Sequence, residues 1–145
     1  MSDVWALSQI RMPGTARTKD DAIRESGQIL VEVGAVDPEY IDSMFDRERS
    51  VSTYMGNYLA IPHGTNESKD QIKRSALSVI RYVEPIDWDG NQVLFALGIA
   101  GYQGGHMDIL SRIAIVFSDT DEVDKLVAAR SAEEIYSLLN AVNQE

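Results

Sequence analysis

The sequence predicts an α/β fold: a single-domain sandwich in which a mixed central sheet carries helices on both faces. Segments with apolar residues at helical spacing alternate with short apolar runs that are typical of strands. One run, residues 93–100, is apolar almost throughout, as expected for a central strand that is covered on both sides. The length of 145 residues suits one compact domain, so we expect residues 1–145 to fold as a unit.

Two helices are expected in the first third of the chain. Thr18 is a good N-cap for the first, because acidic residues follow it in the first turn, and Gly34 is a plausible stop. The second helix should begin at Asp37-Pro38, with proline at the first helical position, and end near Arg49.

Three strands and three further helices follow. Residues 58–61 should form a strand that ends at Pro62, because proline cannot donate a ladder hydrogen bond. Residues 76–83 and 93–100 have strand character. A helix should start at about His106, another at Asp119 or Thr120, and a last one after Ser131, which begins a capping box.

Composition excludes several classes of function. The chain has no cysteine, which rules out disulfides, thiolate catalysis and cysteine-based zinc sites. Its formal net charge is −10, with 13 basic and 23 acidic residues, so nucleic acid is not an expected partner. No apolar run has the length of a membrane span, and the start of the chain does not resemble a signal peptide. We therefore expect a cytoplasmic protein without direct membrane insertion.

The chain contains two histidines, and both lie at the ends of predicted elements. His63 follows the strand that ends at Pro62, and His106 follows a glycine pair at a predicted helix start. Ligand sites in α/β proteins gather at the carboxyl ends of strands and the amino ends of helices. On position alone, two interpretations are equally compatible with the sequence. The histidines form a functional pair, or they are two surface-loop residues without a role.

His63 has the surroundings expected of a nucleophile. If one ring nitrogen donates to a fixed acceptor, the other nitrogen is oriented and becomes more nucleophilic. Phosphoryl transfer also needs positive counter-charge. Candidate suppliers are the guanidinium groups of Arg47 and Arg49, the Thr53 hydroxyl and the backbone N–H groups beside Gly64. His106, at the N-terminus of its predicted helix, is a further candidate.

Simpler interpretations compete with these. Arg47 and Arg49 also suit solvated positions at the end of a helix. Trp5 and Trp88 are expected to be packing residues, and the acidic residues around Asp89 fit a turn better than a calcium loop. The glycines form no nucleotide-binding pattern and the histidines no zinc-binding spacing, so we expect no cofactor and no metal.

Two separated strings contain the histidines: MFDRERSVSTYMGNYLAIPHG, from Met44 to Gly64, and HMDILSRIA, from His106 to Ala114. Both resemble the enzyme IIA domains of the bacterial phosphoenolpyruvate-dependent sugar phosphotransferase system, of the mannitol/fructose class and closest to its mannitol branch. The first string resembles the phosphorylation-site region of that family, and the second resembles the family's helix that begins with a histidine. Asn57 departs from an acidic residue found in some relatives. The resemblance covers nearly the whole chain and implies a single enzyme IIA domain over residues 1–145.

The resemblance implies a phosphocarrier. His63 would accept a phosphoryl group from phospho-HPr, as a tele-phosphohistidine, and pass it to a cysteine of an enzyme IIB during uptake of mannitol or a related polyol. His106 would assist, Arg47 would supply charge, and Thr53 would be a weaker binding residue. Permease domains are absent from these 145 residues, so we expect a free-standing IIA protein or one domain of a larger enzyme. The alternative is a regulatory IIA-like protein, in which phosphorylation of His63 controls binding to a partner.

Partner docking adds one expectation about the surface. Donor and acceptor must both approach His63, so it should lie in a shallow depression with Arg47 beside the imidazole. We expect an exposed apolar rim formed by Ile61, Tyr54 or Met107.

Overall fold

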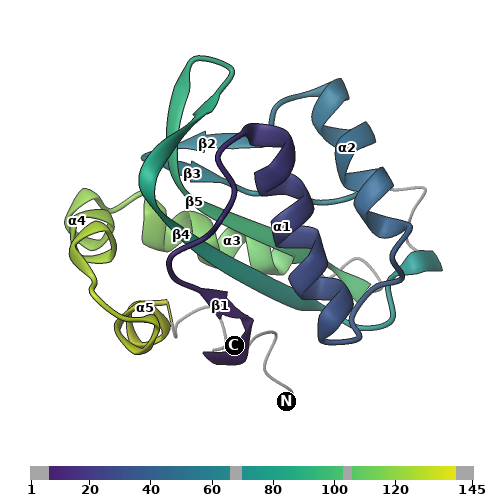
Figure 1. Ribbon diagram of the computed structural model, residues 1–145. Helices are drawn as coiled ribbons and strands as arrows, with labels where there is room; N and C mark the ends of the chain where they lie inside the picture. Colours follow the sequence, from purple (N-terminus) through teal and green to yellow (C-terminus); the bar gives the residue numbers. More distant parts are fainter. Residues whose placement is uncertain (1–6, 66–69, 103–105, 140–145) are drawn as a thin grey trace.

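A five-stranded sheet lies between two layers of helices (Figure 1). The computed structural model describes residues 7–65, 70–102 and 106–139, and the side chains of residues 106 and 107 lie outside the description. Helices α1 and α2 cover one face of the sheet, and α3, α4 and α5 lie toward the other (Figure 1). The predicted α/β sandwich is therefore confirmed.

The sheet is mixed, as predicted. Its order is β1-β4-β5-β3-β2. The pairs β1/β4 and β3/β5 are parallel, whereas β4/β5 and β2/β3 are antiparallel. The strands are β1 (Ile10–Arg11), β2 (Tyr54–Gly56), β3 (Leu59–Ala60), β4 (Ala76–Trp88) and β5 (Asn91–Ala100).

Strands β4 and β5 form a long hairpin. Its two-residue turn consists of Asp89 and Gly90, both with positive φ, at 56° and 94°. Such a turn matches the twist of paired strands, and the predicted turn at this position is confirmed. Strand β4 runs beyond the predicted end at residue 83, and its pairing with β5 is irregular between Arg81 and Ile86. The strand extends because the hairpin partner continues to supply hydrogen bonds.

The first two helices largely follow the prediction. Helix α1 (Lys19–Glu32) is capped by the Thr18 hydroxyl, which accepts from the Asp21 N–H, and Gly34 follows its end with φ at 76°. Helix α2 (Tyr40–Ser50) begins later than Pro38, because the chain first makes a turn in which the Tyr40 N–H donates to the Asp37 carbonyl.

The described residues also include a short 3-10 turn near the start of the chain and three helices after β5. The 3-10 turn η1 spans Leu7–Gln9, and α3 spans His106–Phe117. Helix α4 (Thr120–Ala128) is capped by Asp119, and α5 (Ala132–Leu138) is capped by Ser131, as the sequence predicts. Within the described ranges, none of the helices combines the length and the apolar character that a membrane span requires.

The hydrophobic core has two parts, one on each face of the sheet. One part packs α1 and α2 against residues such as Ile80, Tyr82 and Trp88. The other packs α3, α4 and α5 against residues such as Leu97 and Ile99. Residues 93–100 of β5 are buried throughout, which confirms the predicted central strand. Trp88 is a fully buried core residue, and Trp5 lies outside the described residues.

Candidate functional site

His63 lies at the end of β3, beside the end of β5. After Ala60 the chain continues through Pro62, and His63 then forms an isolated parallel bridge with Ile99. This bridge keeps the register that pairs Ala60 with Ala96. Because parallel strands have their carboxyl ends at the same edge of a sheet, His63 lies where ligand sites of α/β proteins gather. The predicted strand-end position of His63 is confirmed.

The imidazole of His63 is half-buried and oriented by the backbone. Its Nδ1 atom lies 2.7 Å from the carbonyl oxygen of Ile61. A carbonyl oxygen can only accept, so this contact requires the proton on Nδ1. In the neutral ring, Nε2 then carries the lone pair. The arrangement is the one expected for a nucleophilic Nε2 with a fixed partner on the other nitrogen.

His106 is the first residue of α3, as the sequence predicts. Helix α3 follows β5, and His63 follows β3, the parallel neighbour of β5. The two histidine-bearing segments therefore leave neighbouring strands at the same edge of the sheet. The side chain of His106 lies outside the described residues, and its assisting role stays a prediction.

Helix α2 holds the segment after His63 in place. The Gly64 N–H donates to the Tyr40 hydroxyl at 2.8 Å, and the Thr65 N–H donates to the Ser43 Oγ at 3.0 Å. We expected the N–H groups beside Gly64 to face a phosphoryl group; these two instead donate to side chains of α2. Sequence reasoning missed Tyr40 and Ser43, although hydroxyl residues three positions apart share a helix face.

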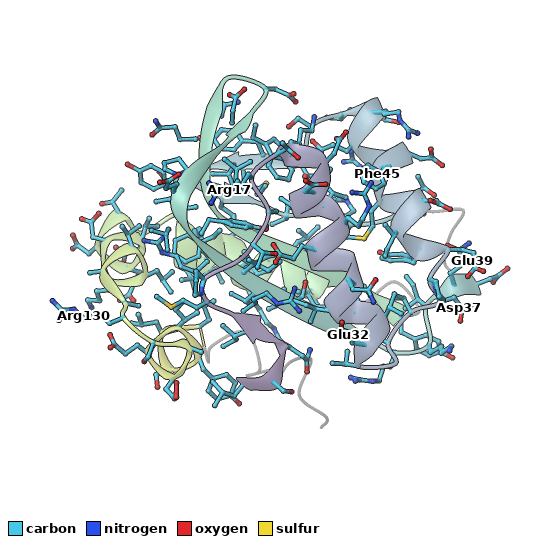
Figure 2. The ribbon with its side chains drawn as sticks, viewed as in Figure 1. Arg17, Glu32, Asp37, Glu39, Phe45 and Arg130 are labelled. Carbon is cyan, nitrogen blue, oxygen red and sulfur yellow. The ribbon has the colours of Figure 1, made fainter. Side chains whose placement is uncertain are left out.

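Acidic residues surround the start of this helix. Figure 2 shows Asp37 and Glu39 pointing outward there, whereas Tyr40 is 2% exposed and faces the sheet. The anchoring contacts of α2 are thus on its buried side, whereas the two acidic residues just before the helix lie on the solvent side.

The two arginines of α2 differ. Arg47 lies one helical turn beyond Ser43 and therefore on the face that holds the His63 segment. It is half-buried, and its guanidinium donates to the Val51 carbonyl at 2.7 Å. Its role as counter-charge stays a prediction. Arg49 is exposed and pairs with Asp46 at 2.5 Å, which confirms the interpretation of Arg49 as a solvated charge.

Thr53 is buried and contacts Glu48. Its hydroxyl donates to Glu48 Oε1 at 2.5 Å, and its N–H donates to Oε2 at 3.0 Å. The Thr53 carbonyl in turn accepts from the Ile61 N–H at 3.0 Å. This hydroxyl is therefore engaged with Glu48, and the predicted binding role of Thr53 stays a prediction.

The predicted apolar rim is wrong at Ile61. This side chain is 4% exposed and belongs to the core on the α3 side, because it continues the inward-facing pattern of β3. Tyr54 is half-buried, and the side chain of Met107 lies outside the described residues. Met55 in β2 and Tyr58 in the turn that leads to β3 are the exposed apolar residues of this segment.

Comparison with known proteins agrees with this geometry. Residues 6–142 match the family model described as phosphoenolpyruvate-dependent sugar phosphotransferase system, EIIA 2. The mannitol-specific phosphotransferase enzyme IIA component of Halalkalibacterium halodurans is 49% identical over 141 residues, covering 97% of each chain. Enzyme IIA of mannitol from Escherichia coli, solved in complex with phosphorylated enzyme IIB, superposes with a TM-score of 0.86 at 30% identity, covering 94% of this chain and 98% of that one.

A regulatory protein shares the fold as well. The nitrogen regulatory protein IIA-Ntr from Neisseria meningitidis superposes with a TM-score of 0.77 at 27% identity, covering 94% of this chain and 96% of that one.

The fold, the strand-end histidine and the family match together define the class: the chain belongs to the EIIA 2 family of the phosphoenolpyruvate-dependent sugar phosphotransferase system. Within that family it is a mannitol-type IIA component.

Proposed function

We propose that the protein accepts a phosphoryl group from phospho-HPr on Nε2 of His63 and passes it to a cysteine of a cognate enzyme IIB. The exchange would take place in the cytoplasm during uptake of mannitol or a related polyol. The observation that carries the proposal is the contact of 2.7 Å between Nδ1 of His63 and the Ile61 carbonyl oxygen, at the end of β3. This contact supports a proton on Nδ1, which would leave the lone pair on Nε2 for attack on phosphorus.

Two displacements make up the cycle. In the first, Nε2 attacks the phosphorus of the HPr phosphohistidine, the new N–P bond forms, and the P–N bond to HPr breaks. In the second, the IIB thiolate attacks the same phosphorus, an S–P bond forms, and the P–Nε2 bond breaks. His63 keeps its Nδ1 proton throughout, because neither displacement uses that nitrogen, which donates to the Ile61 carbonyl oxygen. The protein contributes positioning and charge rather than further covalent chemistry.

Charge around the phosphoryl group would come from two predicted residues. Arg47 is on the α2 face that holds the His63 segment, and α3 begins at His106. A guanidinium and a helix N-terminus both stabilise a nearby anion. Their effect on the transfer rate is largest when negative charge develops on the phosphoryl oxygens in the transition state. The local positive potential would lie within a protein of net charge −10.

The choice of IIB as acceptor is supported by the Escherichia coli relative, whose structure was solved with phosphorylated enzyme IIB. HPr is proposed as donor from the resemblance of the phosphorylation-site region to the family.

The test is phosphorylation in a reconstituted mixture. We expect the protein, incubated with phosphoenolpyruvate, enzyme I and HPr, to gain one acid-labile phosphoryl group by intact mass. His63→Ala should gain none, because this variant lacks the imidazole that is the proposed acceptor. His106→Ala is the matched control and should still accept the group, with slower onward transfer. A His63→Ala protein that still becomes phosphorylated contradicts the proposal.

A regulatory role is the second candidate, favoured by the fold shared with the nitrogen regulatory protein of Neisseria meningitidis. Addition of the cognate IIB separates the two roles. Transfer of the phosphoryl group from His63 to a IIB cysteine supports the transport role. Retention on His63, with a change in affinity for another protein, supports the regulatory role.

A further inference from the structure

The Tyr40 hydroxyl joins two backbone groups of the candidate site. It donates to the Ile99 carbonyl at 2.8 Å and accepts from the Gly64 N–H at 2.8 Å. Tyr40 is 2% exposed. Ile99 is the bridge partner of His63, and Gly64 is the next residue after His63. One hydroxyl thus contacts the residue beside His63 in the sheet and the residue after it in the chain.

These contacts hold His63 from both sides. On one side, the Ile99 N–H donates directly to the Pro62 carbonyl at 2.9 Å. In a regular parallel ladder, the Ile99 carbonyl would accept directly from the Gly64 N–H on the other side. Here the Tyr40 hydroxyl bridges those two groups. The peptide groups of Ile99 therefore fix the chain before His63 directly and the chain after it through Tyr40.

The hydroxyl is suited to this double role. Burial raises the pKa of Tyr40 to about 12, against an opposing effect of the Gly64 N–H. The hydroxyl therefore stays protonated at neutral pH and can donate and accept at once. Tyr40 is also at the first position of α2, so the bridge connects that helix to the edge of the sheet where His63 lies.

We infer that Tyr40 is a positioning residue for phosphoryl transfer: its hydroxyl completes the β3–β5 pairing at His63 and fixes where the imidazole stands. The inference rests on the proposed function of His63. Without the hydroxyl, the Gly64 N–H and the Ile99 carbonyl lose their shared hydrogen-bond partner. The backbone at His63 then shifts, and the imidazole moves with it. Small misplacements of a reacting group cost large factors in rate.

The test compares Tyr40→Phe with Tyr82→Phe. Tyr82 is also a buried core tyrosine, 1% exposed, and its hydroxyl donates to Glu25 at 2.8 Å. It serves as the control for loss of one buried hydroxyl. Both variants keep the ring, so both should fold, which circular dichroism and thermal melting verify. The readouts are the single-turnover rate of transfer from phospho-HPr and the imidazole nitrogen chemical shifts of His63 by NMR.

We expect Tyr40→Phe to slow transfer about tenfold and to shift the His63 imidazole signals, while Tyr82→Phe leaves both close to the wild type. Imidazole signals that stay unchanged in Tyr40→Phe, or a loss of rate that Tyr82→Phe matches, overturn the inference. The wild-type protein distinguishes failure of the Tyr40 inference from failure of the proposed function of His63. If the wild type accepts no phosphoryl group on His63, the proposed function itself fails, whatever the variants do.

Discussion

At the scale of single residues, some buried polar side chains each form several hydrogen bonds. The Glu25 carboxylate is the fullest case in the described chain. It accepts from the Thr15 N–H and hydroxyl, the Ala16 N–H and the Tyr82 hydroxyl, and it pairs with Arg11 at 3.2 Å. These contacts join the segment before α1, the helix itself and β4.

The pKa of Glu25 predicts a pH dependence of stability. Burial by itself raises this pKa, but the hydrogen bonds from Thr15, Tyr82 and Ala16 outweigh it, so the net pKa is lowered from 4.5. The ionised form is thus favoured by folding. Its contribution is present above the unfolded pKa and is lost as pH falls through the lower folded pKa.

We expect Glu25→Gln to lower the free energy of unfolding at pH 7 by about 2 kcal/mol, because neutral acceptors bind these donors less strongly. Its stability should also fall less steeply than that of the wild type below pH 4.5. Urea unfolding at several pH values measures both effects. Glu84→Gln, at an exposed carboxylate, is the control. If the stability of Glu25→Gln falls as steeply below pH 4.5 as that of the wild type, the lowered pKa of Glu25 is contradicted.

At the scale of elements, α1 approaches the sheet closely at Gly98 of β5. The Ser78 hydroxyl fills this contact, because it donates to the Ser26 carbonyl and accepts from the Gly98 N–H. A Cβ atom at Gly98 would lie 2.5 Å from the Ser78 oxygen and 3.2 Å from the Ser26 carbonyl oxygen. Because Gly98 has no side chain, α1 can pack this closely against β5.

Gly98→Ala should therefore destabilise the protein by about 1–3 kcal/mol, since the added methyl group overpacks a filled contact. Chemical denaturation measures the change. The control is Ala114→Gly in α3, which removes a methyl group and should cost about 1 kcal/mol through helix propensity alone. A Gly98→Ala protein as stable as the wild type would show that α1 can move outward at no cost.

At the scale of the whole molecule, Glu48 connects parts of the chain that are far apart in sequence. It lies in α2, is 6% exposed, and binds Thr53 beside β2. It also accepts from Trp88 Nε1 at the tip of the hairpin, at 3.1 Å, and lies 3.7 Å from the Lys19 ammonium at the start of α1. One carboxylate thus joins two helices, a short strand and the hairpin.

Glu48→Ala should lower the free energy of unfolding by about 3–5 kcal/mol, because it leaves buried donors and a partly buried ammonium without their acceptor. Asp46→Ala is the matched control on the same helix. Its carboxylate is exposed and pairs with Arg49, so its loss should cost at most about 1 kcal/mol. Thermal and urea unfolding of the two variants decide the matter, and equal losses would contradict the connecting role of Glu48.

The sequence by itself determined the features that depend on near neighbours. The caps Thr18, Asp119 and Ser131 each bind an N–H two or three residues ahead, so local residue order suffices to place them. The uninterrupted apolar run of β5 predicted a strand covered on both faces, and Pro62 predicted the strand end that places His63. The family resemblance rested on the same local strings.

Only the tertiary structure decided the features that depend on distant residues. Strands β1 and β2 have two and three residues, too few for a periodic pattern, and exist because a neighbouring strand pairs with them. The burial of Ile61 follows from packing against the α3 side of the core. The Tyr40 hydroxyl reaches Ile99, 59 positions away. Hydrogen bonds of this kind leave no local signature, because both partners are chosen by the way the chain folds back on itself.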